Sequence, residues 1–156
     1  MPLFQPRKRI RLAPDAYRDV GNVFSVTIAT RERQPVFADP TLAGACIAHL
    51  RALRTQKGNP VYAYCLMPDH AHVLLGVAAN SPIGRFVASW KSLCYRERRH
   101  MGNPDPFWQR GYFDHALRND EDLRMAALYI LNNPVRRGLV SDFHEYPFCG
   151  SLEFEL

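Results

Sequence analysis

Two histidines separated by one small residue, His70-Ala71-His72, form a pair whose type and spacing could support chemistry. In an extended strand alternate side chains project from the same face, so both imidazoles are expected on one face. Such a pair can hold one divalent metal, with the second nitrogen of each ring free for an outer partner. The spacing is short and common, and it also fits two polar side chains on the solvated face of an antiparallel strand.

A second pair, Tyr129 and Asn133, lies four residues apart in a segment that we predict to be helical. Positions four apart share one face of a helix. The Tyr129 phenol can act as a nucleophile, and the Asn133 amide oxygen can bind a metal. Simpler interpretations are a tyrosine at the edge of the core and an asparagine that terminates a helix. Mixed imidazole and amide-oxygen ligands suit Mn²⁺ or Mg²⁺.

Strands and helices must position these residues, and their signals alternate along the chain. Prolines follow polar capping residues at Asp39-Pro40 and Ser81-Pro82, which predicts a helix start at each. Asn119 is the predicted cap of a third helix, which must stop near Asn133 because Pro134 follows. Runs of β-branched, aromatic and apolar residues predict strands at 23–30, 61–67, 70–77 and 107–117.

The resulting order, β-α-β-β-α-β-α, predicts an α+β fold: a ferredoxin-like four-stranded antiparallel sheet with helices on one face. The third strand buries Ala71, Val73 and Leu75 under those helices, so His70 and His72 should point to the free face. An extra C-terminal helix carrying Tyr129 could return over that face. We expect residues 1–156 to form a single domain, with a basic N-terminal segment at 1–20 and an irregular tail at 141–156.

The charge balance favours a polyanionic partner. The 156 residues include 20 Lys and Arg against 15 Asp and Glu, a formal charge of +5. A basic opening segment and a basic helix face supply candidate phosphate contacts, although ordinary solvation explains such charges equally well. The residues predicted to bind DNA are Arg7, Lys8, Arg9, Arg85, Lys91, Arg96 and Arg110.

Four scattered cysteines without a C-x-x-C pair predict small buried thiols in a reducing compartment. The N-terminal residues lack the apolar core of a signal peptide, and no apolar run reaches the length of a membrane span. We therefore expect a cytoplasmic, nucleoid-associated protein with no membrane partner.

Several motifs in order resemble the REP-associated tyrosine transposases, relatives of the small insertion-sequence transposases within the HUH endonucleases. They are His70-Ala71-His72, residues 107–115 (FWQRGYFDH), residues 129–140 (YILNNPVRRGLV) and residues 146–148 (YPF). The resemblance covers most of the chain, from about residue 23 to residue 151. One departure is Asp69, where the family more often has asparagine, and it could make the site slightly more acidic.

The resemblance implies a metal-dependent single-stranded DNA endonuclease and strand transferase that acts on hairpin-forming repeat DNA as a monomer or homodimer. His70, His72 and Asn133 would hold Mg²⁺ or Mn²⁺, and Tyr129 would form a 5′-phosphotyrosine intermediate. Two alternatives stay open on the residues alone. One is a non-catalytic protein that binds single-stranded nucleic acid on the same sheet face, and the other is a metal-dependent hydrolase in which Tyr129 is structural.

Overall fold

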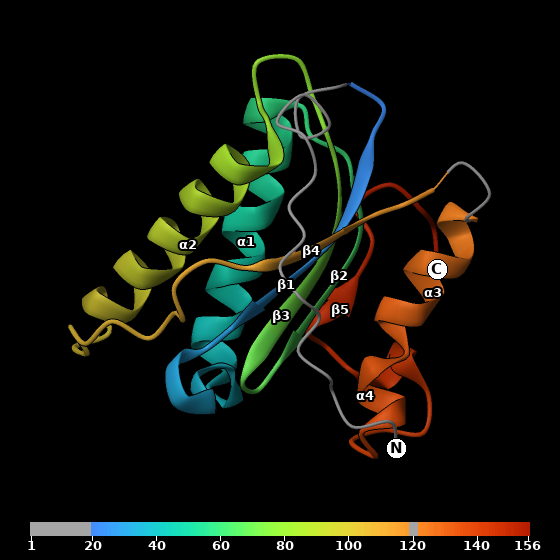
Figure 1. The fold of residues 1–156 in the computed structure, drawn as a ribbon. Coiled ribbons are helices and arrows are strands. Elements are labelled where there is room, and N and C mark those ends of the chain that lie inside the picture. Colours follow the sequence, from blue (N-terminus) through green and yellow to red (C-terminus); the bar gives the residue numbers. More distant parts are fainter. Residues whose placement is uncertain (1–19, 119–121) are drawn as a thin grey trace.

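In the computed structural model, which describes residues 20–118 and 122–156, an antiparallel sheet separates two helical layers (Figure 1). The strand order is β4-β1-β3-β2-β5. The strands are β1 (Val23–Ala29), β2 (Val61–Met67), β3 (His70–Gly76), β4 (Phe113–Ala116) and β5 (Cys149–Gly150). The helices are α1 (Pro40–Lys57), α2 (Ile83–His100), α3 (Leu123–Leu131) and α4 (Asn133–Arg136), with short 3₁₀ turns at Arg31–Arg33, Val36–Ala38 and Phe143–Glu145.

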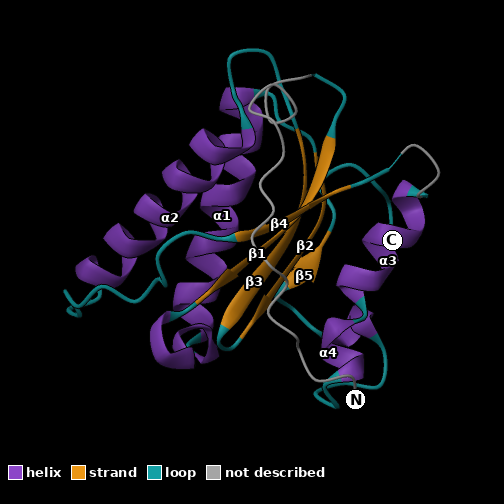
Figure 2. Ribbon diagram, in the orientation of Figure 1, coloured by secondary structure: helices purple, strands orange, loops and turns teal. Residues whose placement is uncertain are grey.

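Helices α1 and α2 cover one face of the sheet (Figure 2). The Asp39 carboxylate accepts hydrogen bonds from the backbone N–H groups of Thr41 and Leu42, so α1 begins at the predicted cap. It ends at Gly58, whose φ of +78° suits a residue without a Cβ. The indole N–H of Trp90 donates to the Cys46 carbonyl at 2.8 Å and ties α2 to α1. The predicted start of α1 agrees with the observed one because Asp39-Pro40 is a local signal.

The start of α2 differs from the prediction. Its N-cap is Pro82, with no side-chain capping bond, so the predicted cap at Ser81 is wrong. Ser81 instead forms an isolated β-bridge with Ala78. Its carbonyl accepts a hydrogen bond from the buried amide of Asn59 at 2.9 Å. A tertiary contact to a buried polar side chain therefore decides the conformation of Ser81.

The second face of the sheet is covered by α3 (Figure 2). The helix is capped by Asp122, whose carboxylate accepts from the N–H groups of Arg124 and Met125, whereas the predicted cap Asn119 lies outside the described residues. The buried residues of this second layer come from α3, β2 and β3: Ala63, Cys65, Met67, Leu74, Ala127, Ile130 and Leu131. No helix in the described ranges is both long and apolar enough to cross a membrane.

The sheet has five strands and not the predicted four. The tail that we predicted to be irregular adds β5 to the edge of β2, where Cys149 lies opposite Cys65. At the other edge, the predicted strand 107–117 is paired only at Phe113–Ala116, apart from a single bridge between Trp108 and Thr30. Between these parts the chain turns at Gly111, which has a φ of +77°. Residues 109–112 therefore interrupt the ladder between β4 and the bridge at Trp108.

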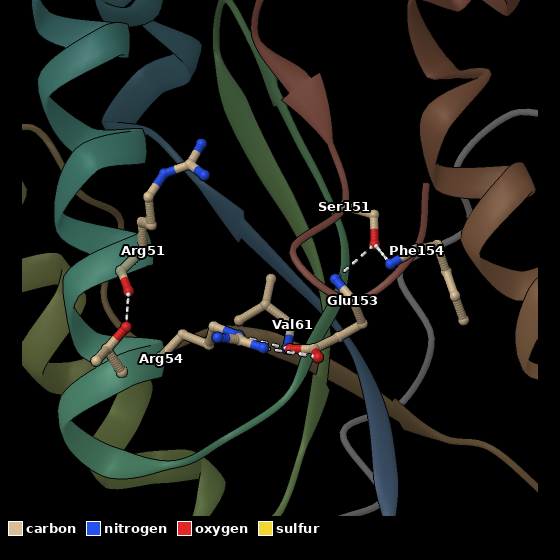
Figure 3. Close-up of polar contacts among 7 residues, drawn as sticks. Arg51, Arg54, Val61, Ser151, Glu153 and Phe154 are labelled. Atoms are coloured by element: carbon tan, nitrogen blue, oxygen red, sulfur yellow. Dashed lines mark hydrogen bonds and ion pairs between the residues drawn. The ribbon is translucent and has the colours of Figure 1, made fainter. Parts of the chain in front are cut away.

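Polar contacts fasten the tail beside β2 (Figure 3). The Arg54 guanidinium on α1 donates to both Glu153 oxygens, at 2.7 and 2.9 Å. Glu153 also accepts from the backbone N–H of Val61 at 3.2 Å. The Ser151 hydroxyl accepts from the N–H groups of Glu153 and Phe154. The end of the chain is thus held to both a helix and a strand.

Candidate functional site

His70 and His72 project together from β3 toward the layer formed by α3. Their ring centroids are 4.7 Å apart and the rings are perpendicular. Leu74, on the same side of the strand, packs in the layer under α3, whereas Ala71 and Val73 pack in the core under α1 and α2. The alternation of β3 therefore gathers the two imidazoles on one face.

Each imidazole is held at Nδ1 by a different neighbour. His70 Nδ1 lies 2.6 Å from a carboxylate oxygen of Asp69, and His72 Nδ1 lies 3.0 Å from the Thr27 hydroxyl. Thr27 is directly opposite His72 in the β1–β3 ladder. These contacts fix both rings and leave the Nε2 atoms for a ligand, which is the arrangement of metal-binding histidines with outer partners.

Both histidines are neutral near pH 7. Burial lowers the pKa of His70, against the opposing effect of the Asp69 hydrogen bond. Burial, then the neighbouring His70 and the guanidinium of Arg136, lower the pKa of His72 to about 3. A neutral imidazole is the form that binds a metal, so the protonation state of both rings suits metal ligation.

Tyr129 lies near the C-terminal end of α3, with 67% of its surface exposed. The guanidinium carbon of Arg136 is 3.9 Å from the centroid of the Tyr129 ring. The same guanidinium donates to the Asn133 side-chain oxygen at 2.8 Å, and the Asn133 amide N–H donates to the Ile130 carbonyl at 3.2 Å. Arg136 therefore links the two residues that the sequence analysis paired.

The prediction that Tyr129 and Asn133 share one helix face is wrong. Helix α3 ends at Leu131, Asn132 is its C-cap, and Asn133 begins the separate helix α4. Pro134 has no backbone N–H to donate to the Ile130 carbonyl, which accepts instead from the Asn133 side-chain amide, so the helical hydrogen bonds are interrupted here. Tyr129 and Asn133 are therefore neighbours through Arg136 and not through helical repetition.

Sequence reasoning did not single out Arg136, Arg137 or Thr27. The positive charges of Arg136 and Arg137 both lower the pKa of His72, so they act on the histidine pair. The sequence signal that could have identified Arg136 and Arg137 is their position as two adjacent arginines shortly after Asn133. For Thr27 there was none, since its role depends on the register between β1 and β3.

Among the described residues, those predicted to bind DNA do not gather around the histidine pair. Arg85, Lys91 and Arg96 lie on α2, on the opposite side of the sheet from α3, so the structure does not bring them to the histidines. Arg85, Arg96 and Arg110 are exposed. Lys91 is half-buried and its ammonium donates to the carbonyls of Gln109 and Gly111, both at 3.0 Å. The segment with Arg7, Lys8 and Arg9 lies outside the described residues.

The histidine pair alone would give a metal only two protein ligands. Among residues 20–118 and 122–156, no group of three or more His, Cys, Asp or Glu side chains is placed to hold a metal. Any third protein ligand for a metal at this histidine pair would have to be of another residue type. The Asn133 side-chain oxygen has two lone pairs, and the bond from Arg136 uses one of them.

The comparisons with known proteins place this chain in a family. Residues 23–133 match the family described as "Transposase IS200 like", so the chain belongs to the IS200-like transposases. Within that family, the predicted resemblance to REP-associated tyrosine transposases is confirmed by relatives of that name.

Two of these relatives are bacterial proteins. The chain is 28% identical over 97 residues to a protein named as a REP-associated tyrosine transposase of Haemophilus influenzae, covering 55% of each chain. It is 27% identical over 98 residues to the REP-associated tyrosine transposase of Escherichia coli, covering 62% of this chain and 58% of the relative. The chain thus spans less than two thirds of the length of these curated relatives.

Solved structures share the fold. One is a REP-associated tyrosine transposase bound to a REP hairpin, with a TM-score of 0.70 and 22% identity over 85% of this chain and 78% of that chain. Another is a crystal structure from Deinococcus radiodurans described as a transposase, with a TM-score of 0.54 and 26% identity over 73% of this chain and 92% of that chain.

Proposed function

We propose that this chain is a metal-dependent enzyme that nicks and rejoins single-stranded DNA, with Tyr129 as nucleophile and hairpin-forming repeat DNA as substrate. The observation that carries the proposal is the neutral pair His70 and His72, each fixed at Nδ1, on the sheet face that α3 covers. Membership of the IS200-like transposases supports the reaction type. The hairpin-bound structural neighbour supports the substrate class.

The donor set fits a divalent cation. His70 and His72 would offer their Nε2 atoms, and Asn133 would offer its side-chain oxygen, a mixture that suits Mn²⁺ or Mg²⁺. A bound cation would polarise the scissile phosphate and offset the negative charge that develops on it. Asp69 and Thr27 would keep the two imidazoles oriented throughout.

In the proposed reaction the phenol of Tyr129 is the nucleophile. The Tyr129 oxygen attacks the phosphorus and forms a tyrosine–phosphate ester, while the bond from phosphorus to the 3′ oxygen breaks. The phenol loses its proton, and the leaving oxygen takes one up to become a 3′-hydroxyl. Attack by another 3′-hydroxyl then reverses these steps and reseals the strand without an external energy source.

Arg136 would serve the same step. Its guanidinium lies over the Tyr129 ring and is positively charged, so it can attract the phosphate to the nucleophile. Arg137, whose charge also acts on His72, adds to this positive potential. Helix α4, which includes Arg136, lies on the α3 side of the sheet, at the end where β3 begins (Figure 1).

The experiment is adduct formation on a labelled single-stranded hairpin with Mn²⁺, analysed on a denaturing gel. Wild type should give a covalent protein–DNA band and Tyr129→Phe none, although the variant should fold and bind the hairpin normally. Tyr62→Phe removes a phenol oxygen from the same sheet face and should retain the band. An adduct in Tyr129→Phe would make another residue the nucleophile. Cleavage by wild type without an adduct would indicate a hydrolase, and binding without cleavage a non-catalytic binder.

A further inference from the structure

The four cysteines, scattered along the sequence, form two contacting pairs in the fold. Cys65 and Cys149 lie directly opposite each other on β2 and β5, where their thiols interact, and the thiols of Cys46 on α1 and Cys94 on α2 also interact. None of the four is in a disulfide. The two pairs differ in access, because Cys149 is half-buried and the other three are fully buried.

The strand register places Cys65 and Cys149 at a separation suited to a disulfide. The two residues are directly opposite each other, and the N–H of Leu66 donates to the carbonyl of Phe148 at 2.9 Å. That bond identifies Cys65 and Cys149 as a non-hydrogen-bonded pair, in which Cα atoms lie about 4.5 Å apart. Disulfides bridge Cα separations of about 4.4–6.8 Å. Neither strand needs to shift its register for the bond to form.

The tail is already held where this bond would form. The Tyr146 hydroxyl donates to the Leu66 carbonyl at 2.6 Å. The thiol of Cys149 donates to the Phe143 carbonyl at 3.4 Å. The hydrogen bond from Cys65 lowers the pKa of Cys149, although burial opposes the shift. Cys149 is thus the more accessible of the two thiols and the more readily ionised one.

The pair continues a row of side chains that crosses the sheet. Thr27 is opposite His72, His72 is opposite Cys65, and Cys65 is opposite Cys149. A covalent bond at one end of this row would fix the strand that neighbours His72.

We propose that Cys65 and Cys149 are a reversible oxidation site, joined as a disulfide by hydrogen peroxide, which locks the tail onto β2. The Cys149 thiolate attacks the peroxide, forming an S–O bond and breaking the O–O bond, and hydroxide leaves. The Cys65 sulfur then displaces the oxygen from the sulfenic acid, and water leaves. In total two thiols lose two electrons and two protons, and one hydrogen peroxide is reduced to two waters. A dithiol reductant reverses the change by exchange.

The test is peroxide treatment of the folded wild-type protein, followed by alkylation in denaturant and peptide mass spectrometry. The peptides carrying Cys65 and Cys149 should be linked, and Cys46 and Cys94 should be alkylated. The melting temperature should rise by about 5–15 °C and return on addition of dithiothreitol, because the bond constrains the unfolded chain. Cys149→Ser should show neither the link nor the rise.

The pair Cys46 and Cys94 is the internal control, because its thiols also touch but are fully buried. No linked peptide from Cys65 and Cys149 would overturn the proposal. Equal linkage of Cys46 to Cys94 would also overturn it, since oxidation would then proceed through unfolded molecules. The test uses neither DNA nor metal, so its outcome is independent of the nuclease proposal.

Discussion

Replacing Arg136 by alanine should reduce the activity of the site far more than the stability of the fold. Its guanidinium lies 3.9 Å from the Tyr129 ring centroid and donates to the Asn133 side-chain oxygen at 2.8 Å. Arg136 is exposed, and so is two thirds of Tyr129. A cation–π contact at an exposed site contributes about 0.5–1 kcal/mol, and one hydrogen bond contributes about 0.5–1.5 kcal/mol. The free energy of unfolding should therefore fall by about 1–2.5 kcal/mol.

The effect on chemistry should be larger because Arg136 positions both Tyr129 and Asn133. Displacing a reacting group by about 1 Å can reduce a rate on the order of 100-fold. We expect the single-turnover rate of adduct formation to fall by about that factor, with hairpin affinity falling much less. The assay is a time course with excess Arg136→Ala enzyme over labelled hairpin DNA, accompanied by urea unfolding of the same preparation.

Arg137→Ala is the matched control. It removes the same charge next in sequence, and Arg137 also acts electrostatically on His72. The structure records no ring contact for Arg137 within the described residues. Equal rate losses in both variants would show that charge alone matters, and an unchanged rate in Arg136→Ala would refute its positioning role.

Three further predictions concern other parts of the chain. Thr27→Val removes the hydroxyl at His72 Nδ1 and should weaken Mn²⁺ binding, measured by calorimetry, about 10-fold or more. The melting temperature should not change. An unchanged affinity would contradict the role of Thr27. The Arg54 hydrogen bond lowers the pKa of Glu153, so its stabilising effect is present above the ordinary pKa of 4.5 and is lost as pH falls through the lower folded value. Glu153→Gln should therefore be less stable than wild type in urea at pH 7 but not at pH 2, and parallel pH profiles would refute this linkage. Lys91→Met should lower the free energy of unfolding by about 1–2 kcal/mol through two lost hydrogen bonds. If the slope of log affinity for single-stranded DNA against log salt concentration is smaller by about 0.7 in this variant, Lys91 instead contacts a phosphate.

The central hairpin was predictable because its determinants are local. Pro60 precedes β2, Pro68 and Asp69 form the turn, and apolar residues continue on both sides of it. The predicted range 61–67 is the observed β2. Strand β5 has only two residues and is recognisable only by its partner, so no sequence pattern could reveal it.

The candidate site was predictable only where residues share one element. His70 and His72 lie on one strand, and strand alternation alone places them together. The Tyr129–Asn133 pair depended on a helix continuing beyond Leu131, and it does not. There Asn132 uses its side-chain amide to hydrogen-bond the Leu128 carbonyl at the helix end. Contacts such as Thr27 with His72 arise from pairing between distant segments, for which a single sequence contains no signal.

The fastened tail also determines how copies of this chain can associate. An unpaired strand edge is a template for pairing with another molecule. The tail occupies the outer edge of β2. The N–H of Val61 donates to Glu153 at one end of the strand, and the N–H of Leu66 donates to the Phe148 carbonyl near the other end. A continuous sheet through two molecules would therefore have to grow from one of two short edge strands, the four-residue β4 or the two-residue β5. Removing the tail would leave the backbone N–H and C=O groups along the outer edge of β2 unpaired. The truncated protein should therefore aggregate while its helices are still folded.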